Sequence, residues 1–161
     1  MNQIDLNGQV AVVTGGAQGF GLASAKRFVA SGAKVSLWDM DGDALKKAAE
    51  LLGGNVSTEV VNITDFDALA AAHAKVEKDL GPVSILLNSA GIAGKNAPLD
   101  EMNLDEWRKV IEINLTGTFY VNRVVIPSMK QRNYGRIVNI SSVAGRRATA
   151  TCRPIPPPRR A

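Results

Sequence analysis

A glycine-rich segment, Thr14–Gly21, directly follows the apolar run Val10–Val13, and the next residues, Leu22–Val29, have the apolar spacing of a helix. The order is therefore buried strand, glycine-rich turn, helix. Glycines let the backbone turn sharply and leave no Cβ atom in the way of a pyrophosphate. The helix that follows directs its N–H groups and the positive end of its dipole at such a group. This segment predicts a dinucleotide-binding turn.

Strand and helix patterns alternate along the chain with short connections, which is typical of a parallel α/β sheet. The predicted strands are Val10–Thr14, Lys34–Trp38, Val56–Val61, Ser84–Asn88 and Arg136–Ile140. The predicted helices are Leu22–Ser31, Asp41–Leu52, Asp65–Leu80 with Thr64 as its N-cap, and a long helix Leu104–Gln131 with Asn103 as its N-cap and Pro127 near its end.

Asp39 follows the second predicted strand, 18 residues after Gly21. In a fold of this kind an acidic residue there accepts hydrogen bonds from the adenosine ribose hydroxyls and repels a 2′-phosphate. Neither Met40 nor the glycine-rich segment supplies an Arg or Lys to attract that phosphate. The sequence therefore predicts NAD as the cofactor, rather than NADP.

The composition narrows the class of protein. The 161 residues are 45% apolar, which suits one globular domain with a core. We see no signal peptide and no apolar run of about 20 residues, so we expect a cytoplasmic protein without a membrane segment. The single cysteine, Cys152, gives no disulfide framework and no metal pattern. Of the net charge of +4, residues 148–161 carry +3, so we expect no binding to nucleic acid.

Four motifs in order resemble those of the classical short-chain dehydrogenases/reductases. Thr14–Gly21 resembles the TGxxxGxG pattern of that family, and Asn88–Gly91 resembles its NNAG motif. Asn114 resembles the helical catalytic asparagine, and Asn139–Ser142 resembles the end of the fifth strand, which carries the catalytic serine. The resemblance runs from about Leu6 to Gly145.

The resemblance implies a Rossmann-type three-layer α/β/α domain with a parallel sheet in the order 3-2-1-4-5. It also implies an NAD-dependent oxidoreductase that interconverts an alcohol and a ketone, similar to 3-oxoacyl reductases or to polyol and sugar dehydrogenases. Members of the family form homo-oligomers through their long helix and a later one. We expect this assembly to be impaired here, because the later helix starts at a tyrosine that this chain lacks.

The resemblance assigns two catalytic residues: Ser142, which steadies the substrate oxygen, and Asn114, which anchors a water. The implied cofactor-binding residues are Gly15, Gln18, Gly19, Phe20, Gly21, Asp39, Met40, Asn62, Ile63, Asn88, Ala90 and Gly91. Three residues depart from the family pattern. Ser89 replaces an asparagine, Asn62 replaces an aspartate that contacts the adenine amino group, and Phe20 replaces an aliphatic residue.

A larger departure lies near the end of the sequence. The family places its general acid/base, a tyrosine, thirteen residues after the serine, and a lysine four residues later lowers the pKa of that tyrosine. Counted from Ser142, these positions hold Ile155 and Arg159. We therefore expect this chain to lack turnover. A non-catalytic dinucleotide-binding module is the alternative function.

Residues 146–161 are rich in proline and arginine and predict a disordered tail after a domain of residues 1–145. Residues 153–161 can be encoded as CGC CCT ATT CCG CCT CCA AGG CGG GCN. Read two bases further on, this string encodes Pro-Tyr-Ser-Ala-Ser-Lys-Ala-Gly, with the tyrosine codon over positions 154–155 and the lysine codon over 158–159. We interpret the tail as the product of a frameshift. A natural tail with a role of its own is the alternative.

Overall fold

The computed structural model describes residues 4–54 and 56–142. Five parallel strands form one sheet in the order β3-β2-β1-β4-β5. The strands are β1 (Val10–Thr14), β2 (Lys34–Asp39), β3 (Val56–Val60), β4 (Ile85–Asn88) and β5 (Arg136–Asn139). This order confirms the predicted Rossmann-type fold. The predicted tail lies outside the described residues.

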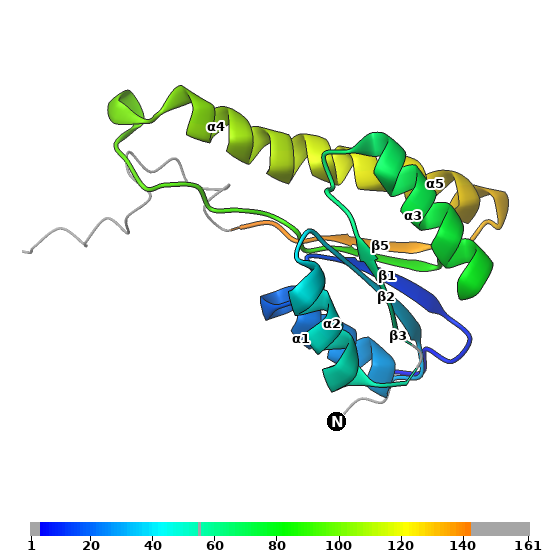
Figure 1. The fold of residues 1–161 in the computed structure, drawn as a ribbon. Coiled ribbons are helices and arrows are strands. Elements are labelled where there is room, and N and C mark those ends of the chain that lie inside the picture. The colour runs from blue at the N-terminus through cyan, green and yellow to red at the C-terminus, as the bar shows by residue number, and fades with distance from the viewer. Residues whose placement is uncertain (1–3, 55, 143–161) are drawn as a thin grey trace, which may run out of the picture.

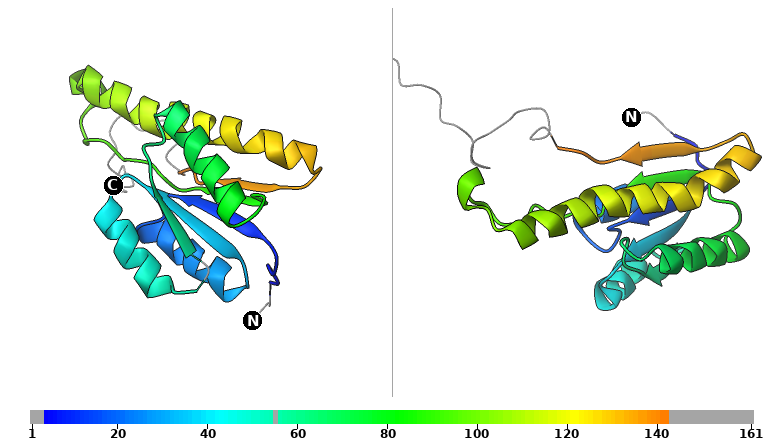
Figure 2. Two further views of the ribbon diagram at one scale, coloured as in Figure 1. Left: turned by 45° about the vertical axis from the view of Figure 1, so that its right-hand side comes forward. Right: turned by 90° about the horizontal axis from the view of Figure 1, so that it is seen from above.

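Helices cover both faces of the sheet. They are α1 (Gly19–Ala30), α2 (Gly42–Leu52), α3 (Phe66–Asp79), α4 (Leu104–Ile111) and α5 (Thr118–Gln131), with a short 3₁₀ turn at Leu99–Glu101 and a π-helical turn at Glu112–Gly117. Figure 1 shows α1 and α2 on one side of the sheet and α3 and α5 on the other. Figure 2 shows that α4 and α5 form one long rod whose α4 end extends past the sheet.

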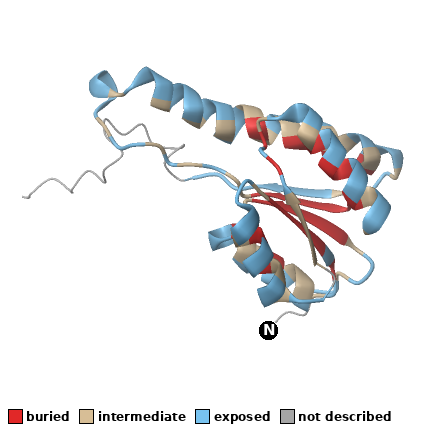
Figure 3. Cartoon of the chain, viewed as in Figure 1, coloured by how far each residue is buried: buried red, intermediate tan, exposed pale blue. Residues whose placement is uncertain are grey.

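Alternate residues of the strands supply two separate cores. Val13, Leu37 and Leu87 pack with α1 and α2, whereas Val12 and Leu86 pack with α3 and α5. Every residue of β1 is buried, as Figure 3 shows for the central strands. A strand with helices on both faces needs this continuous apolar sequence, which explains why Val10–Val13 predicted it correctly.

The α3 helix begins differently from our prediction. Its N-cap is Asp65, whose side chain accepts a hydrogen bond from the backbone N–H of Ala68 at 3.0 Å. The predicted cap, Thr64, instead donates its hydroxyl to the side-chain oxygen of Asn62 at 2.9 Å. Asp65 is the better cap because its carboxylate also interacts favourably with the helix dipole. The predicted cap of α4 is confirmed, since Asn103 accepts from the N–H groups of Asp105 and Glu106.

The predicted long helix spans the right residues but contains a π-helical turn. The turn Glu112–Gly117 separates α4 from α5 and contains Asn114. Pro127 lies inside α5, which continues to Gln131. Single π-helical turns inside α-helices are frequent at functional sites.

Two neighbouring surfaces are apolar and exposed. In β5 and just after it, Ile137, Val138 and Ile140 are 37–49% exposed. The rod of α4 and α5 exposes Leu104, Trp107, Ile111, Leu115 and Phe119. Figure 3 shows the outer side of this rod as exposed along most of its length. Among the described helices, none is long and apolar enough to cross a membrane.

His73, on α3, is expected to make the stability of the fold depend on pH. Its ring is nearly buried, and its Nε2 atom lies 3.6 Å from a Glu77 carboxylate oxygen without a hydrogen bond in the described structure. Burial lowers the pKa of His73 below its ordinary value of 6.5, and nearby Arg132 lowers it further, against the opposing effect of Glu77. The unfolded chain therefore binds the proton more readily than the folded one.

We expect stability to be greatest above about pH 6.5 and to fall as the pH drops through the lowered pKa of His73. Urea unfolding at pH 7.5 and pH 5.5 measures this loss. The His73→Gln variant, which has no proton to bind, should lose less free energy of unfolding between the two pH values. An equal loss in both proteins would contradict the role of His73.

Candidate functional site

A pocket of about 340 Å³ opens where the carboxyl ends of β1, β2 and β4 meet the start of α1. Ten of the twelve predicted cofactor-binding residues line it: Gly15, Gln18, Gly19, Phe20, Asp39, Met40, Asn62, Ile63, Ala90 and Gly91. The other lining residues are Trp38, Val61, Ser89, Ile92 and Ile113. The pocket therefore lies where the strand order reverses, between β1 and β4, which is where open α/β sheets bind ligands.

Three of the four glycines in the loop belong to the motif, and each is needed for a different local reason. Gly15 has a φ of +63°, and a Cβ atom there would lie 2.9 Å from the backbone of Ala90. Gly19 has a φ of +55° and nothing within 4 Å of the position of a Cβ atom. Gly21 does not line the pocket, and its Cβ would collide with the carbonyl oxygen of Gly15. Thus Gly15 and Gly21 permit close packing of the backbone, and Gly19 leaves an open cradle.

The first turn of α1 faces this cradle. Helix α1 begins at Gly19, three residues earlier than predicted, so the second and third glycines of the motif belong to its first turn. Its N-cap residue, Gln18, supplies no side-chain hydrogen bond to the helix. A helix start of this kind presents N–H groups and a positive dipole to an anion, and phosphate is the group that it fits.

The Asp39 carboxylate is fixed against the glycine-rich loop. One of its oxygens accepts from the N–H of Ala17 at 3.3 Å, and the other accepts from the N–H of Asp41 at 3.2 Å. The loop is also tied to β2 by the N–H of Gly16, which donates to the Trp38 carbonyl at 3.2 Å. Each carboxylate oxygen keeps a lone pair for a further donor. The described residues that line the pocket include no Arg or Lys.

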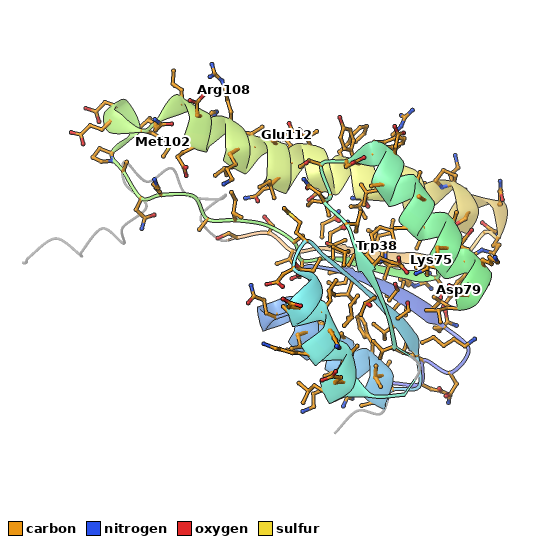
Figure 4. All side chains as sticks on the ribbon, viewed as in Figure 1. Trp38, Lys75, Asp79, Met102, Arg108 and Glu112 are labelled. Atoms are coloured by element: carbon orange, nitrogen blue, oxygen red, sulfur yellow. The ribbon has the colours of Figure 1, made fainter. Side chains whose placement is uncertain are left out.

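Trp38 forms part of the apolar wall beside Asp39. It is fully buried, and its indole N–H donates to the Ser36 hydroxyl at 3.1 Å. Figure 4 labels Trp38 at the sheet, on the side of α3 and α5, in agreement with its packing in that core. Because the indole N–H is satisfied within β2 and the ring is fully buried, Trp38 supports the pocket from the core.

Asn62 lies on the same wall but is oriented by Thr64. Its side-chain oxygen accepts from both the backbone N–H and the hydroxyl of Thr64, at 3.0 and 2.9 Å. These two bonds use both lone pairs of the oxygen. Any contact of Asn62 with a bound base therefore comes from its Nδ2 donor, rather than from the oxygen that an aspartate would offer.

Four predicted site residues do not line the pocket: Gly21, Asn88, Asn114 and Ser142. Asn88 is buried at the end of β4 and receives a hydrogen bond from Thr14. Asn114 bonds the backbone of Ile92 twice, accepting from its N–H at 2.9 Å and donating to its carbonyl at 2.8 Å. Ser142 is exposed, three residues past the end of β5. Asn88 and Asn114 thus hold the residues that form the pocket wall.

No cluster of three or more His, Cys, Asp or Glu side chains suited to a metal ion is found among residues 4–54 and 56–142. The site combines a glycine-rich turn, an open helix start and a fixed carboxylate. On this parallel sheet, these features define a Rossmann-type domain of the kind that binds dinucleotides.

The chain belongs to the short-chain dehydrogenase family, whose model matches residues 9–153. It is 46% identical over 140 residues to 2-dehydro-3-deoxy-L-rhamnonate dehydrogenase (NAD(+)) of Sphingomonas sp. strain SKA58, an alignment that covers 86% of this chain and 55% of that protein. It is 39% identical over 140 residues to acetoacetyl-CoA reductase of Paracoccus denitrificans, covering 86% of this chain and 57% of the relative.

The fold matches a crystal structure of NAD⁺-bound xylitol dehydrogenase with a TM-score of 0.88 and 36% sequence identity, covering 91% of this chain and 57% of that one. The chain thus spans about half the length of the curated relatives that it matches. The family contains oxidoreductases that act on sugars and on acyl thioesters. This agrees with the predicted family and with a small-molecule substrate.

Proposed function

We propose that this chain is the NAD-binding part of an oxidoreductase that interconverts an alcohol and a ketone. One observation carries the proposal: the Asp39 carboxylate is held against the glycine-rich loop by Ala17, in a pocket whose described lining lacks a cation. A carboxylate there accepts from the two hydroxyls of an unmodified ribose and repels a 2′-phosphate. The cradle at Gly19 and the start of α1 would hold the pyrophosphate.

The remaining lining residues would hold the two ends of the dinucleotide. The residues that line the pocket beside Asp39 would border the adenosine in this proposal: Trp38, Met40, Asn62 and Ile63. The segment Ser89–Ile92 forms the opposite side, past the pyrophosphate cradle, and would border the nicotinamide. When bound, the nicotinamide supplies hydride transfer. In this proposal Ser142 orients the substrate oxygen, and Asn114 fixes the backbone of Ile92 and anchors a water.

The proposed substrate is a small alcohol or ketone, such as a sugar, a polyol or a 3-oxoacyl thioester, as the names of the relatives suggest. We propose a cytoplasmic location, where NAD is available. A homo-oligomer is the form proposed for an intact enzyme of this family.

A specific feature of the sequence favours a second candidate, a dinucleotide-binding module without turnover. Ile155 and Arg159 stand where the family has its tyrosine and lysine, and both lie outside the described residues. Isoleucine has no group that exchanges a proton. With these residues the chain would bind NAD and leave the alcohol proton without an acceptor.

Binding is tested first, with the purified 161-residue chain and NADH. Trp38 lines the pocket, so we expect energy transfer from its indole to bound NADH, a saturable signal, and a rise in melting temperature with NAD⁺. The Trp107→Phe variant is the control, because Trp107 is half-exposed on α4 and does not line the pocket. The variant should keep the signal. If the chain binds neither NADH nor ADP-ribose, both candidate functions are overturned.

Turnover then separates the two candidates. The chain is mixed with NAD⁺ and a panel of polyols and sugar acids, or with NADH and acetoacetyl-CoA. Substrate-dependent formation or loss of NADH supports the enzyme and refutes the module. NADH binding without turnover supports the module, and it agrees with the absence of the family's tyrosine and lysine from positions 155 and 159.

A further inference from the structure

The side-chain oxygen of Asn139 joins three elements at the carboxyl end of the sheet. It accepts from the Nδ2 atom of Asn88, on β4, at 2.8 Å, and from the Nδ2 atom of Asn122, on α5, at 3.3 Å. Asn139 itself is the last residue of β5. One acceptor with two lone pairs is thus shared by donors from the two neighbouring elements.

The bond to Asn88 supports the start of the pocket wall. Asn88 is buried, and its oxygen receives the hydroxyl of Thr14 at 3.5 Å. The same hydroxyl oxygen accepts from the N–H groups of Ser89 and Ala90, both at 3.2 Å. Asn139 therefore fixes the side chain that immediately precedes the wall segment Ser89–Ile92.

The bond to Asn122 supports the other end of the same segment. Asn122 also donates to the Thr118 carbonyl at 2.8 Å, and the Thr118 hydroxyl donates to the Asn114 carbonyl at 2.8 Å. Asn114 then holds the backbone of Ile92 through its two hydrogen bonds. These bonds join Asn122 to the π-helical turn, and the turn to Ile92.

We propose that Asn139 is a positioning residue for the wall Ser89–Ile92, which borders the nicotinamide end of the site. The inference rests on the proposed dinucleotide function. Both ends of the wall are tied through hydrogen-bonded groups to one oxygen atom, that of Asn139. The adenosine end depends instead on Asp39, whose hydrogen bonds to Ala17 and Asp41 are not part of this network. The network meets the glycine-rich segment only at its first residue, Thr14.

This arrangement separates a positioning role from a merely structural one. Loss of the Asn139 oxygen leaves the buried Nδ2 donor of Asn88 without its acceptor, which destabilises the wall from both ends. The adenosine pocket keeps its own contacts. A positioning role therefore predicts loss of affinity for a whole dinucleotide with little change for ADP-ribose, which lacks the nicotinamide.

Three variants and two ligands test the proposal by calorimetry, with melting temperatures recorded alongside. Asn139→Leu removes the acceptor at similar size, and we expect about a tenfold weaker affinity for NADH and less than about a twofold change for ADP-ribose. Asn139→Asp keeps an acceptor for both donors and should rescue NADH binding to within about twofold of the original chain. Asn122→Asp replaces the required donor by an acceptor and should behave like Asn139→Leu.

The outcomes are distinct from those of the proposed function. If the original chain binds neither ligand, the dinucleotide function fails, and the positioning role fails with it. If the original chain binds both ligands and Asn139→Leu weakens both equally, or neither, the positioning role alone is overturned. If Asn139→Leu does not fold, the comparison of Asn122→Asp with Asn139→Asp gives the same test. Asn122→Asp loses the hydrogen bond between residues 122 and 139, and Asn139→Asp keeps it.

Discussion

Replacement of Gly21 by alanine is expected to destabilise the domain by about 1–3 kcal/mol and to weaken NADH binding about 100-fold. A Cβ atom at this position would collide with the carbonyl oxygen of Gly15, and would lie 2.9 Å from the Gly15 carbonyl carbon and 3.3 Å from the Cα atom of Gly16. All three are backbone atoms of the loop, so no side chain can rotate away. The first turn of α1 must therefore move relative to the phosphate cradle.

Gly19→Ala should give losses of similar size for a different physical reason. The new methyl group meets nothing within 4 Å, so its cost to stability is that of a residue at φ +55°, about 1–2 kcal/mol. The methyl group would, however, project into the open cradle and keep a pyrophosphate from the backbone. NADH affinity is expected to fall about 100-fold, as for Gly21→Ala, since the phosphates can no longer reach the helix start.

Gly54→Ala is the matched control for the backbone strain alone. Gly54 has a φ of +64°, has open space around it, and does not line the pocket. It should lose stability like Gly19→Ala and keep its affinity for NADH. Urea unfolding and NADH titration of the three variants measure both effects. An unchanged melting temperature and affinity in Gly21→Ala would contradict the close packing of α1 on the loop.

The strands could be predicted from the sequence almost to the residue. The central strands β1, β2 and β4 are mostly buried and apolar, and β1 to β5 all differ from prediction by at most one residue at either end. The edge strands β3 and β5 are not buried in this way, and the glycines just before them marked where they begin. The order of the strands came from the family resemblance, because which strands pair depends on contacts between distant residues. The structure shows β4 paired with β1, a pairing that the pattern of apolar residues alone does not predict.

The details of the site depend on geometry that a local pattern does not encode. The spacing of apolar residues predicted the long helix. It did not predict the π-helical turn around Asn114, because such a turn changes that spacing very little. Thr64 and Asp65 are both good caps by residue type, and the structure shows Asp65 as the cap while Thr64 bonds to Asn62. Val61, Ser89 and Ile113 line the pocket because three distant segments meet there. These three residues could have been found from the sequence only because each is next to a predicted site residue.

The second large effect expected is a reversal of cofactor preference in the double variant Asp39→Ser/Met40→Arg. The original chain should prefer NADH to NADPH by about 100-fold, since like charges about 4 Å apart repel by about 1 kcal/mol in water and about 4 kcal/mol near a protein surface. Met40 lines the pocket beside Asp39 and is 64% exposed, so an arginine there has room to reach a 2′-phosphate. We expect the double variant to bind NADPH more tightly than NADH, as measured by titration with each.

The single variants separate charge from shape as the cause of the preference. Asp39→Asn has the same size and no charge, so NADPH affinity should rise about tenfold if repulsion excludes the phosphate. If steric contact excluded it instead, Asp39→Asn would change nothing and the smaller Asp39→Ala would admit NADPH. Salt gives an independent check, because screening weakens repulsion at a partly exposed carboxylate such as that of Asp39. Preference for NADH in the original chain should therefore narrow between 0.05 and 0.5 M salt, and a preference that stays constant would contradict the electrostatic origin.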